Sequence, residues 1–372
     1  MSHKDVVEDL FDIAGIKLNG KNPWDVQVKN SKLYKRLISQ GSLGFGEAYM
    51  DGWWDVKSVD QLCFRILRSN TEKNKKVIMN LKNFVYILHA NLMNMQTKTR
   101  SLKVGKIHYD VGNKLYKLML GKHMAYSCGY WKNAKNLDEA QEAKLDLICK
   151  KLKLKPGMKV LDIGCGWGTF AKFAAERYKV EVVGITISKE QLKYAKEHCK
   201  GLPVEIKLQD YRNVKGQFDR ILSIGMFEHI GNKNYRVYME IVHKHLKEDG
   251  ISLLHTIGAN ISSKTIDPWL NKYIFPNAVM PSMKQISTAA EGLFVMEDWH
   301  NFGLDYDKTL MAWFKNFDKN WDKLKNDYDE RFYRIWKYYL LSCAAGFRAR
   351  TINLWQIVLT KRGLLEGYES VR

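Results

Sequence analysis

The sequence predicts an α/β fold with a Rossmann-like sheet, joined to a smaller and mainly helical N-terminal domain. The first observation is an apolar strand at 159–164 that runs into a glycine-rich turn. The second is a β-like run at 181–186 followed by a helical stretch, which completes a βαβ unit. The third is continued alternation, with strands expected at 204–208, 218–225, 250–256 and 357–362. Alternation of this kind is typical of a sheet with parallel strands and covering helices.

The segment KVLDIGCGWGTF, residues 159–170, forms the glycine-rich turn. Gly164, Gly166 and Gly168 permit positive φ angles and close approach of the backbone to a ligand. The helix expected at 169–178 would direct its positive end toward that ligand. Glycines also serve tight turns for structural reasons alone, and the surrounding βαβ pattern is what favours a binding loop.

The glycine spacing narrows the choice of ligand. GxGxG stands where dinucleotide-binding turns have GxGxxG, and no GxxxxGK[ST] phosphate loop is present. A ligand that lacks phosphates but has adenine, ribose and an amino-acid tail fits better. We therefore expect S-adenosylmethionine as the cofactor.

Composition limits the protein class. At 372 residues and 45% hydrophobic content the chain is long enough for two globular domains. No apolar run approaches the roughly 20 residues that cross a bilayer, and the N-terminus lacks a signal pattern, so we expect a cytoplasmic protein. No CxxC motif occurs, which argues against a disulfide framework and a metal site. We expect free thiols at Cys63, Cys128, Cys149, Cys165, Cys199 and Cys343.

The formal net charge of +20 suggests a polyanionic partner, either nucleic acid or an anionic membrane. Residues 57–108 contain 11 Lys and Arg but only two acidic residues, and apolar residues recur at helical spacing between 77 and 95. This basic stretch is either a docking surface for acidic phospholipid headgroups or an ordinary packed helix with a solvated basic edge.

The chain is predicted to divide near residue 106. Residues 1–106 read as mainly helical, with a turn-rich break at 41–54, and residues 107–372 carry the α/β pattern. Between about 260 and 350 the alternation stops. An aromatic-rich, mostly helical insertion is expected there, and such a cover would suit a buried apolar substrate.

Several polar residues follow predicted strands, where open α/β sheets place their ligands. Glu228 and His255 are candidate acid and base groups, although a buried structural histidine is about as common. Cys128 and Tyr306 add polar atoms within aromatic surroundings, and Cys128 can equally be a small buried apolar residue. Asp210 follows the third strand and either helps to hold adenine or caps a turn.

Taken together, several segments resemble bacterial cyclopropane-fatty-acyl-phospholipid synthases, which are related to the mycolic acid cyclopropane synthases. The resemblance covers nearly the whole chain, with Ala278 as a departure where the family pattern has glycine. The segments are GSLGFGEAYMDGWW (41–54), HYDVGNKLY (108–116), YSCGYW (126–131), LDIGCGWGTF (161–170), GITISKEQ (184–191), GMFEHIG (225–231), LLHTIG (253–258), NKYIFPN (271–277) and SCAAGFRAR (342–350).

The resemblance implies a class I S-adenosylmethionine-dependent methyltransferase fold with a seven-stranded sheet. It also implies a bound bicarbonate ion that acts as a base. The implied cofactor-binding residues are Tyr126, Ser127, Leu161, Asp162, Ile163, Gly164, Cys165, Gly166, Trp167, Gly168, Thr186, Ile187, Ser188, Gln191, Asp210 and Tyr211. The implied bicarbonate ligands are Cys128, Glu228, His255, Tyr306 and the backbone of Ile257, with Cys343 as a further catalytic candidate.

The resemblance further implies the reaction: transfer of a methylene group to the cis double bond of acyl chains, through methyl transfer, a carbocation and deprotonation. Alternatives are a methyl-branched or hydroxylated product, or an RNA-binding protein, for which no base-stacking motif is present. Because the mycolic acid relatives lack such an N-terminal domain, we expect membrane phospholipid as substrate. We also expect peripheral association with the inner face of an anionic membrane, a homodimer by family analogy, and no nucleic-acid partner.

Overall fold

The structure, a computed structural model, describes residues 2–69 and 112–372. Most of the basic stretch, its expected helix at 77–95 and the predicted domain boundary at 106 lie outside the described residues, so these remain predictions. The described chain forms two compact units. Unit 1 comprises 2–69, 264–277 and 306–352, and unit 2 comprises 112–263, 278–305 and 353–372. The segment predicted as a helical insertion is thus divided between the two units.

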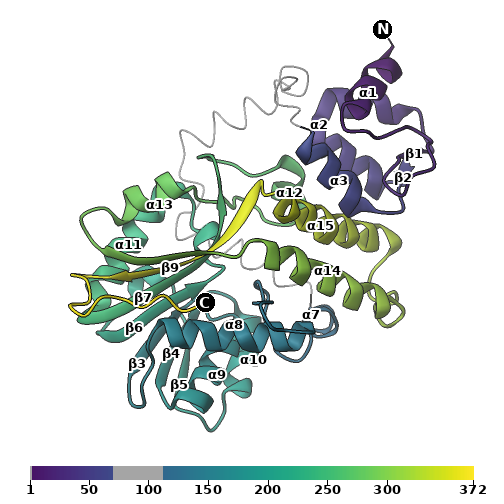
Figure 1. Ribbon diagram of the computed structural model, residues 1–372. Helices are drawn as coiled ribbons and strands as arrows, with labels where there is room; N and C mark the ends of the chain where they lie inside the picture. The colour runs from purple at the N-terminus through teal and green to yellow at the C-terminus, as the bar shows by residue number, and fades with distance from the viewer. Residues whose placement is uncertain (1, 70–111) are drawn as a thin grey trace. The chain divides into compact units, whose positions relative to one another are not determined.

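Unit 2 is built on a seven-stranded sheet with the strand order β5-β4-β3-β6-β7-β9-β8 (Figure 1). Strands β5, β4, β3, β6 and β7 pair in parallel, whereas β8 and β9 pair antiparallel. The predicted seven-stranded α/β fold is confirmed. The strands are β3 (Lys159–Ile163), β4 (Glu181–Thr186), β5 (Val204–Leu208), β6 (Phe218–Ile224), β7 (Leu246–Ala259), β8 (Val295–Asn301) and β9 (Ile352–Thr360).

Strand β8 was not predicted. Its sequence VMEDWHN has no regular apolar alternation, and most of its residues are only partly buried or exposed. A strand at the sheet edge is stabilised by its pairing with β9 more than by an apolar face of its own. The sequence pattern of residues 295–301 therefore gives little indication that they form a strand.

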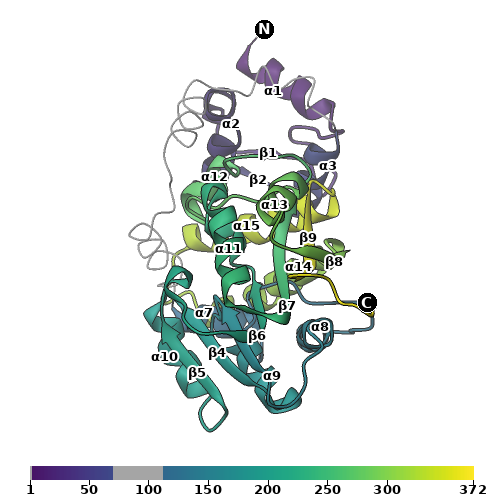
Figure 2. The ribbon, with the colours of Figure 1, turned by 90° about the vertical axis from the view of Figure 1, so that its left-hand side faces the viewer.

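Helices cover both faces of this sheet (Figure 2). Because side chains alternate along a strand, Leu161 and Ile163 of β3 enter the core under α11 and α13, whereas Val160 enters the core under α8, α9 and α10. The helices of unit 2 are α7 (Asn113–Leu120), α8 (Leu137–Lys151), α9 (Thr169–Tyr178), α10 (Lys189–His198), α11 (Tyr235–His245) and α13 (Met283–Ala290).

The strand order reverses beside β3. From β3 the chain adds β4 and β5 on one side of the sheet, and it then returns to add β6 and β7 on the other. The helices that follow β3 and β6 lie on opposite faces, so a crevice opens where the carboxyl ends of these strands diverge. The strand order alone therefore predicts that a ligand binds at the carboxyl ends of these strands.

Unit 1 is mainly helical. The predicted turn-rich break at 41–54 is wrong for most of its length, because α2 continues through it to Met50 with a kink at Gly41 (φ 57°). Gly46 instead permits close packing, since an added Cβ would collide with the ring of Trp269. The elements are α1 (His3–Asp12), β1 (Gln27–Val28), α2 (Lys32–Met50), β2 (Trp54–Asp55), α3 (Val59–Arg68), α12 (Pro268–Tyr273), α14 (Leu304–Lys319) and α15 (Glu330–Arg348).

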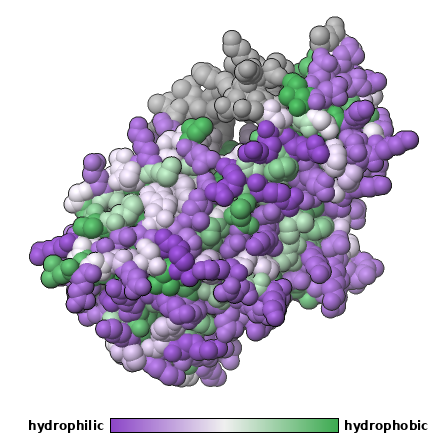
Figure 3. All heavy atoms as spheres, viewed as in Figure 1, coloured by the Kyte–Doolittle hydropathy of each residue, from purple (hydrophilic) through white to green (hydrophobic). Residues whose placement is uncertain are grey.

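Figure 3 shows hydrophilic side chains over most of the visible face, with hydrophobic residues in small separate groups. Within residues 2–69 and 112–372, no helix combines the length and the apolar character that spanning a bilayer requires.

Candidate functional site

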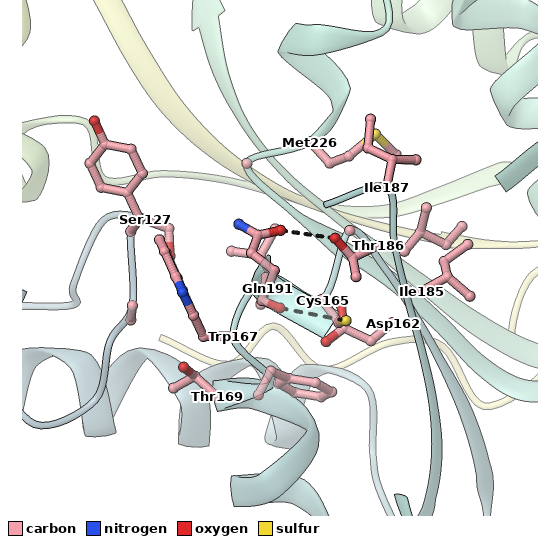
Figure 4. A pocket seen from close by; sticks show the side chains of 18 of the residues that line it. Ser127, Asp162, Cys165, Trp167, Thr169, Ile185, Thr186, Ile187, Gln191 and Met226 are labelled. Carbon is pink, nitrogen blue, oxygen red and sulfur yellow. Dashed lines mark hydrogen bonds between the residues drawn. The ribbon is translucent and has the colours of Figure 1, made fainter. Parts of the chain in front are cut away.

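A pocket opens at the carboxyl ends of β3, β4, β5 and β6, in the crevice that the topology creates. Most of the predicted cofactor-binding residues line it: Tyr126, Ser127, Asp162, Ile163, Gly164, Cys165, Gly166, Trp167, Thr186, Ile187, Gln191, Asp210 and Tyr211. Figure 4 shows Ser127, Trp167, Asp162 and Gln191 arranged around the cavity. Their assignment to a cofactor stays a prediction, but the structure brings them together.

Three predicted cofactor residues do not line the pocket. Leu161 points into the core under α11. Gly168 begins α9 with φ 80°, and Ser188 caps α10 by accepting the Gln191 N–H at 3.3 Å. Their immediate roles are to shape the loops that present the neighbouring residues.

The glycine turn has the backbone geometry that its sequence predicts. Gly164, Gly166 and Gly168 all have positive φ angles of 56–81°. An added Cβ on Gly164 would meet the Met226 side chain at 2.8 Å, whereas one on Gly166 would meet no protein atom within 4 Å. The open side of Gly166 is where a ligand can approach the backbone.

The turn after β4 is held by side-chain hydrogen bonds. Thr186 Oγ1 donates to Gln191 Oε1 at 2.9 Å (Figure 4). The same oxygen accepts the Ser188 N–H at 3.2 Å. Because the Gln191 oxygen is engaged, its amide nitrogen is the group left to donate to a ligand.

Asp210 has both of the roles that the sequence left open. It lines the pocket, and its Oδ1 accepts the Arg212 N–H at 2.9 Å, so it caps the short 3₁₀-helix Tyr211–Asn213. Burial raises the pKa of Tyr211, whose hydroxyl has no hydrogen-bond partner among the described residues.

Two buried charged residues line the pocket near Ser127. Lys144, which the sequence did not single out, projects from α8 and donates to Ser127 Oγ at 2.9 Å. Burial lowers the pKa of Lys144 to about 8. Burial raises the pKa of Asp162 to about 7, although the Lys144 charge opposes this, and Asp162 Oδ2 has no partner within the described chain.

Glu228 lies on the 3₁₀-helix Phe227–His229 after β6 and is buried. Its Oε1 accepts the Ile257 N–H at 2.6 Å, so the amide predicted to hold bicarbonate is bonded to Glu228 here. Its Oε2 lacks a partner among the described residues. Burial raises the pKa of Glu228 to about 7, because the Ile257 amide and the Thr256 hydroxyl offset only part of the desolvation.

His255 on β7 is 1% exposed, and its Nδ1 lies 3.2 Å from the side-chain amide nitrogen of Gln356 on β9. If that amide donates, the neutral imidazole carries its proton on Nε2, which has no partner within the described residues. Burial, with the charges of Lys144 and Lys151, lowers the pKa of His255 well below its usual value. A neutral donor on Nε2 and an unpartnered carboxyl oxygen on Glu228 are chemically suited to a small oxyanion that carries an O–H.

The remaining predicted catalytic residues have different surroundings. Cys128 is fully buried in unit 2 and its thiol donates to the Gly129 carbonyl at 3.1 Å. Tyr306 and Cys343 belong to unit 1, where the Tyr306 ring stacks on Phe347. Burial raises the pKa of the Cys343 thiol to about 12, which makes a thiolate nucleophile unfavourable. The bicarbonate assignments stay predictions.

Sequence reasoning missed Lys144 and Gln356 because neither carries a local signal. A lysine on an amphipathic helix reads as solvated, and Gln356 lies within an otherwise apolar strand. A polar residue inside the run LWQIVL was the only available hint.

A family model described as mycolic acid cyclopropane synthetase matches residues 96–357. The cyclopropane-fatty-acyl-phospholipid synthase of Escherichia coli K12 is 52% identical over 367 residues, which covers 99% of this chain and 95% of that protein. A probable fatty acid methyltransferase of Pseudomonas putida is 39% identical over 68% of both chains.

Solved structures of cyclopropane synthases are also similar to this chain. The cyclopropane synthase MmaA2 of Mycobacterium tuberculosis is 30% identical with a TM-score of 0.67, covering 70% of this chain and 98% of that one. The mycolic acid cyclopropane synthase CmaA1 complexed with SAH and CTAB is 31% identical with a TM-score of 0.65 over the same shares. The resemblance inferred from the sequence is confirmed: the chain has the fold of S-adenosylmethionine-dependent methyltransferases and belongs to the mycolic acid cyclopropane synthetase family.

Proposed function

We propose that this protein transfers a methylene group from S-adenosylmethionine to the cis double bond of unsaturated acyl chains in membrane phospholipids, forming cyclopropane rings. The observation that carries the proposal is the 52% identity to the E. coli synthase, which extends over nearly the full length of both chains. The pocket at the strand ends supports it, because it presents no phosphate-binding loop and is lined by apolar and hydrogen-bonding groups.

S-adenosylmethionine would supply an electrophilic methyl group in this pocket. The residues present fit it: Gly166 leaves the backbone open, Gln191 presents an amide, and the buried Asp162 has an unpartnered oxygen. An alkene is a weak nucleophile, so the main task of these side chains is to hold the reacting groups in line and close together. Apolar surroundings at the double bond would exclude water that could otherwise trap the carbocation.

A bicarbonate ion held by Glu228 and His255 would supply the base that removes the proton and allows the ring to close. The unpartnered Glu228 Oε2 and His255 Nε2 support this proposal, since buried polar atoms are almost always satisfied. Glu228, when ionised, accepts an O–H and thereby orients the ion. His255, neutral because of burial, donates from Nε2.

Glu228→Gln tests this role. The variant keeps the shape but replaces a charged acceptor by an amide, so turnover should fall about tenfold to a hundredfold, the equivalent of a charge-assisted hydrogen bond. The affinity for S-adenosylmethionine should barely change. Glu240→Gln on the exposed side of α11 is the matched control and should behave as wild type. Wild-type turnover of Glu228→Gln in bicarbonate-depleted buffer would refute the role.

Product mass distinguishes ring formation from its rivals. Cyclopropane formation adds CH2 to the acyl chain, whereas a hydroxylated product carries a further water. A methyl-branched alkene has the same mass as the ring, so NMR of the isolated acyl ester must accompany mass spectrometry. Relatives named as fatty acid methyltransferases make this comparison necessary. A branched or hydroxylated product from unsaturated phospholipid would overturn ring formation.

We also propose that the protein docks on anionic membranes at the cytoplasmic face. The net charge of +20 and the composition of the basic stretch support this. Lys98→Gln with Arg100→Gln should weaken binding to anionic vesicles, measured by sedimentation, about thirtyfold, because each basic residue near a membrane contributes about 1 kcal/mol. Lys179→Gln with Lys200→Gln removes the same charge elsewhere and is the control.

Equal loss in both pairs would mean that net charge rather than this stretch governs docking. Binding to neutral vesicles that does not respond to salt would refute electrostatic docking altogether. Competition by RNA that displaces the protein from vesicles would favour the nucleic-acid alternative. The proposed homodimer is supported by family analogy alone, and sedimentation velocity of the full chain would test it.

A further inference from the structure

Lys144 is a buried cation that forms no ion pair with a carboxylate among the described residues, although the charge of Asp162 acts on it within the same pocket. It is 1% exposed, and its Nζ donates to the Ser127 hydroxyl at 2.9 Å. Within residues 2–69 and 112–372 it forms no salt bridge. A buried ammonium is costly unless a negative charge compensates it, so this arrangement calls for an anion.

The opposite charge in the same pocket is also incomplete. Asp162, at the end of β3, is 2% exposed and its Oδ2 has no hydrogen-bond partner among the described residues. Lys144, Ser127 and Asp162 all line the pocket. The pocket therefore offers a buried cation and a buried carboxyl group that do not neutralise each other at hydrogen-bond distance.

The amino-acid end of S-adenosylmethionine has the complementary pair of charges, a carboxylate and an ammonium group. We propose that Lys144 is the counter-charge for the cofactor's carboxylate, and that it makes the pocket selective for the intact amino-acid end. The inference rests on the proposed placement of S-adenosylmethionine in this pocket.

A purely structural lysine on the same helix looks different. Lys151, two turns further along α8, is also fully buried, but its Nζ lies 3.3 Å from Asp298 Oδ2 and 3.1 Å from His300 Nδ1. Lys151 does not line the pocket. The fold thus satisfies one buried lysine with its own carboxylate and leaves the other facing the ligand.

The loop that Lys144 contacts has other support. Gln141, one turn earlier on α8, donates to the Ser127 carbonyl at 2.9 Å. Because this bond holds the backbone of the loop, the ammonium of Lys144 is not required to position it.

Equilibrium binding of two ligands tests the inference. Decarboxylated S-adenosylmethionine keeps the sulfonium and the ammonium but lacks the carboxylate. Wild type should bind the intact cofactor about tenfold to a hundredfold more tightly than the decarboxylated one, the range expected for a buried charge-assisted hydrogen bond. In Lys144→Met this ratio should fall to between about one and three. The affinity of the variant for the decarboxylated ligand should change little.

Three further variants separate charge from structure. Gln141→Leu removes the loop contact, and Lys151→Met removes a buried lysine outside the pocket. Both should keep the wild-type ratio even if they lower stability. Lys144→Arg keeps the charge and should retain part of the ratio. If Lys144→Met does not fold, equal affinities of wild type for both ligands would still overturn the inference.

Other outcomes identify which claim fails. An unchanged ratio in Lys144→Met overturns the role of Lys144. If that variant keeps the ratio but needs more bicarbonate for half-maximal turnover, the charge serves the bicarbonate and the inference is wrong. If Gly166→Val leaves S-adenosylmethionine affinity unchanged, the placement of the cofactor in this pocket fails instead.

Discussion

Glu47 in unit 1 and Glu228 in unit 2 are similarly buried, 8% and 4% exposed, but their carboxyl groups have opposite surroundings. Glu47 accepts from Arg36 at 2.6 Å, from Lys272 at 2.6 Å and from the Tyr273 hydroxyl at 2.8 Å. Glu228 accepts one backbone amide, and its other oxygen is unpartnered within the described chain.

The two pKa shifts follow from this difference. Burial alone would raise the pKa of Glu47, but the bonds from Lys272, Arg36 and Tyr273 outweigh it and the pKa falls to about 2. For Glu228 burial dominates, and the pKa rises to about 7. Glu47 therefore links α2 to α12 and stabilises unit 1, whereas Glu228 carries a cost in stability of the kind that functional sites retain.

The largest expected effect is on stability and concerns Glu47, the glutamate with paired carboxylate oxygens. Glu47→Gln should lower the free energy of unfolding by about 3 kcal/mol at pH 7, because the folded-state pKa of about 2 lies well below the ordinary value of a glutamate side chain. That stability is present above pH 4.5 and is lost as the pH falls toward 2. Urea unfolding at several pH values measures it. A loss that persists unchanged at pH 2 would contradict the charge argument.

The next largest effect is on cofactor affinity and compares substitutions at Gly166 and Gly201. Gly166→Val should weaken S-adenosylmethionine binding by about a hundredfold or more, because the new side chain enters the pocket and the backbone has φ 56°. Gly201→Val is the matched control, since Gly201 has φ 81° and open space but does not line the pocket. Calorimetric titration should show normal affinity for the control. Equal losses in both would mean that backbone strain, rather than blocking, is responsible.

In unit 2, replacing Glu228 by Gln should raise the free energy of unfolding, whereas the same replacement at Glu47 lowers it. The folded-state pKa of Glu228 lies above its unfolded value, so ionisation costs stability as the pH rises from about 4.5 through 7. Glu228→Gln should gain about 3 kcal/mol at pH 8 and little at pH 4, because the pKa of Glu228 is raised by about as much as that of Glu47 is lowered. Urea unfolding at these two pH values tests it, with Glu240→Gln as the exposed control. A variant less stable than wild type at pH 8 would mean that Glu228 is held by partners like those of Glu47.

The smallest effect concerns the orientation of His255. Gln356→Leu removes the group beside His255 Nδ1, so the Nε2–H form is no longer favoured and turnover should fall about fivefold, the cost of a lost neutral hydrogen bond. The dependence of turnover on bicarbonate should weaken, whereas affinity for S-adenosylmethionine should not. Gln356→Glu can accept from Nδ1–H and would enforce the other tautomer, with a larger loss. A Gln356→Leu variant that loses turnover without any change in bicarbonate dependence would indicate a packing role only.

The sequence alone could not show which of these two glutamates has its carboxylate paired in the fold. Glu47 and Glu228 both follow apolar residues closely, in GFGEAYM and GMFEHIG, and local pattern does not reveal that one meets Arg36 and Lys272 while the other meets a single amide. Glu228 was singled out because it follows a strand at its carboxyl end, where open α/β sheets bind their ligands. Glu47 was not, because nothing nearby in the chain marks its partners.

The sequence by itself determined the βαβ alternation, the glycine turn at the end of β3 and the family, because these depend on residues close together in the chain or on motifs read one at a time. Only the tertiary structure decided that α2 runs through 41–50, that β8 pairs at the sheet edge, and that Lys144 and Gln356 approach groups far away in sequence. Whether a buried charge is paired depends on which distant segments the fold packs against it. Pairing in turn decides whether that charge stabilises the fold or is left for a ligand.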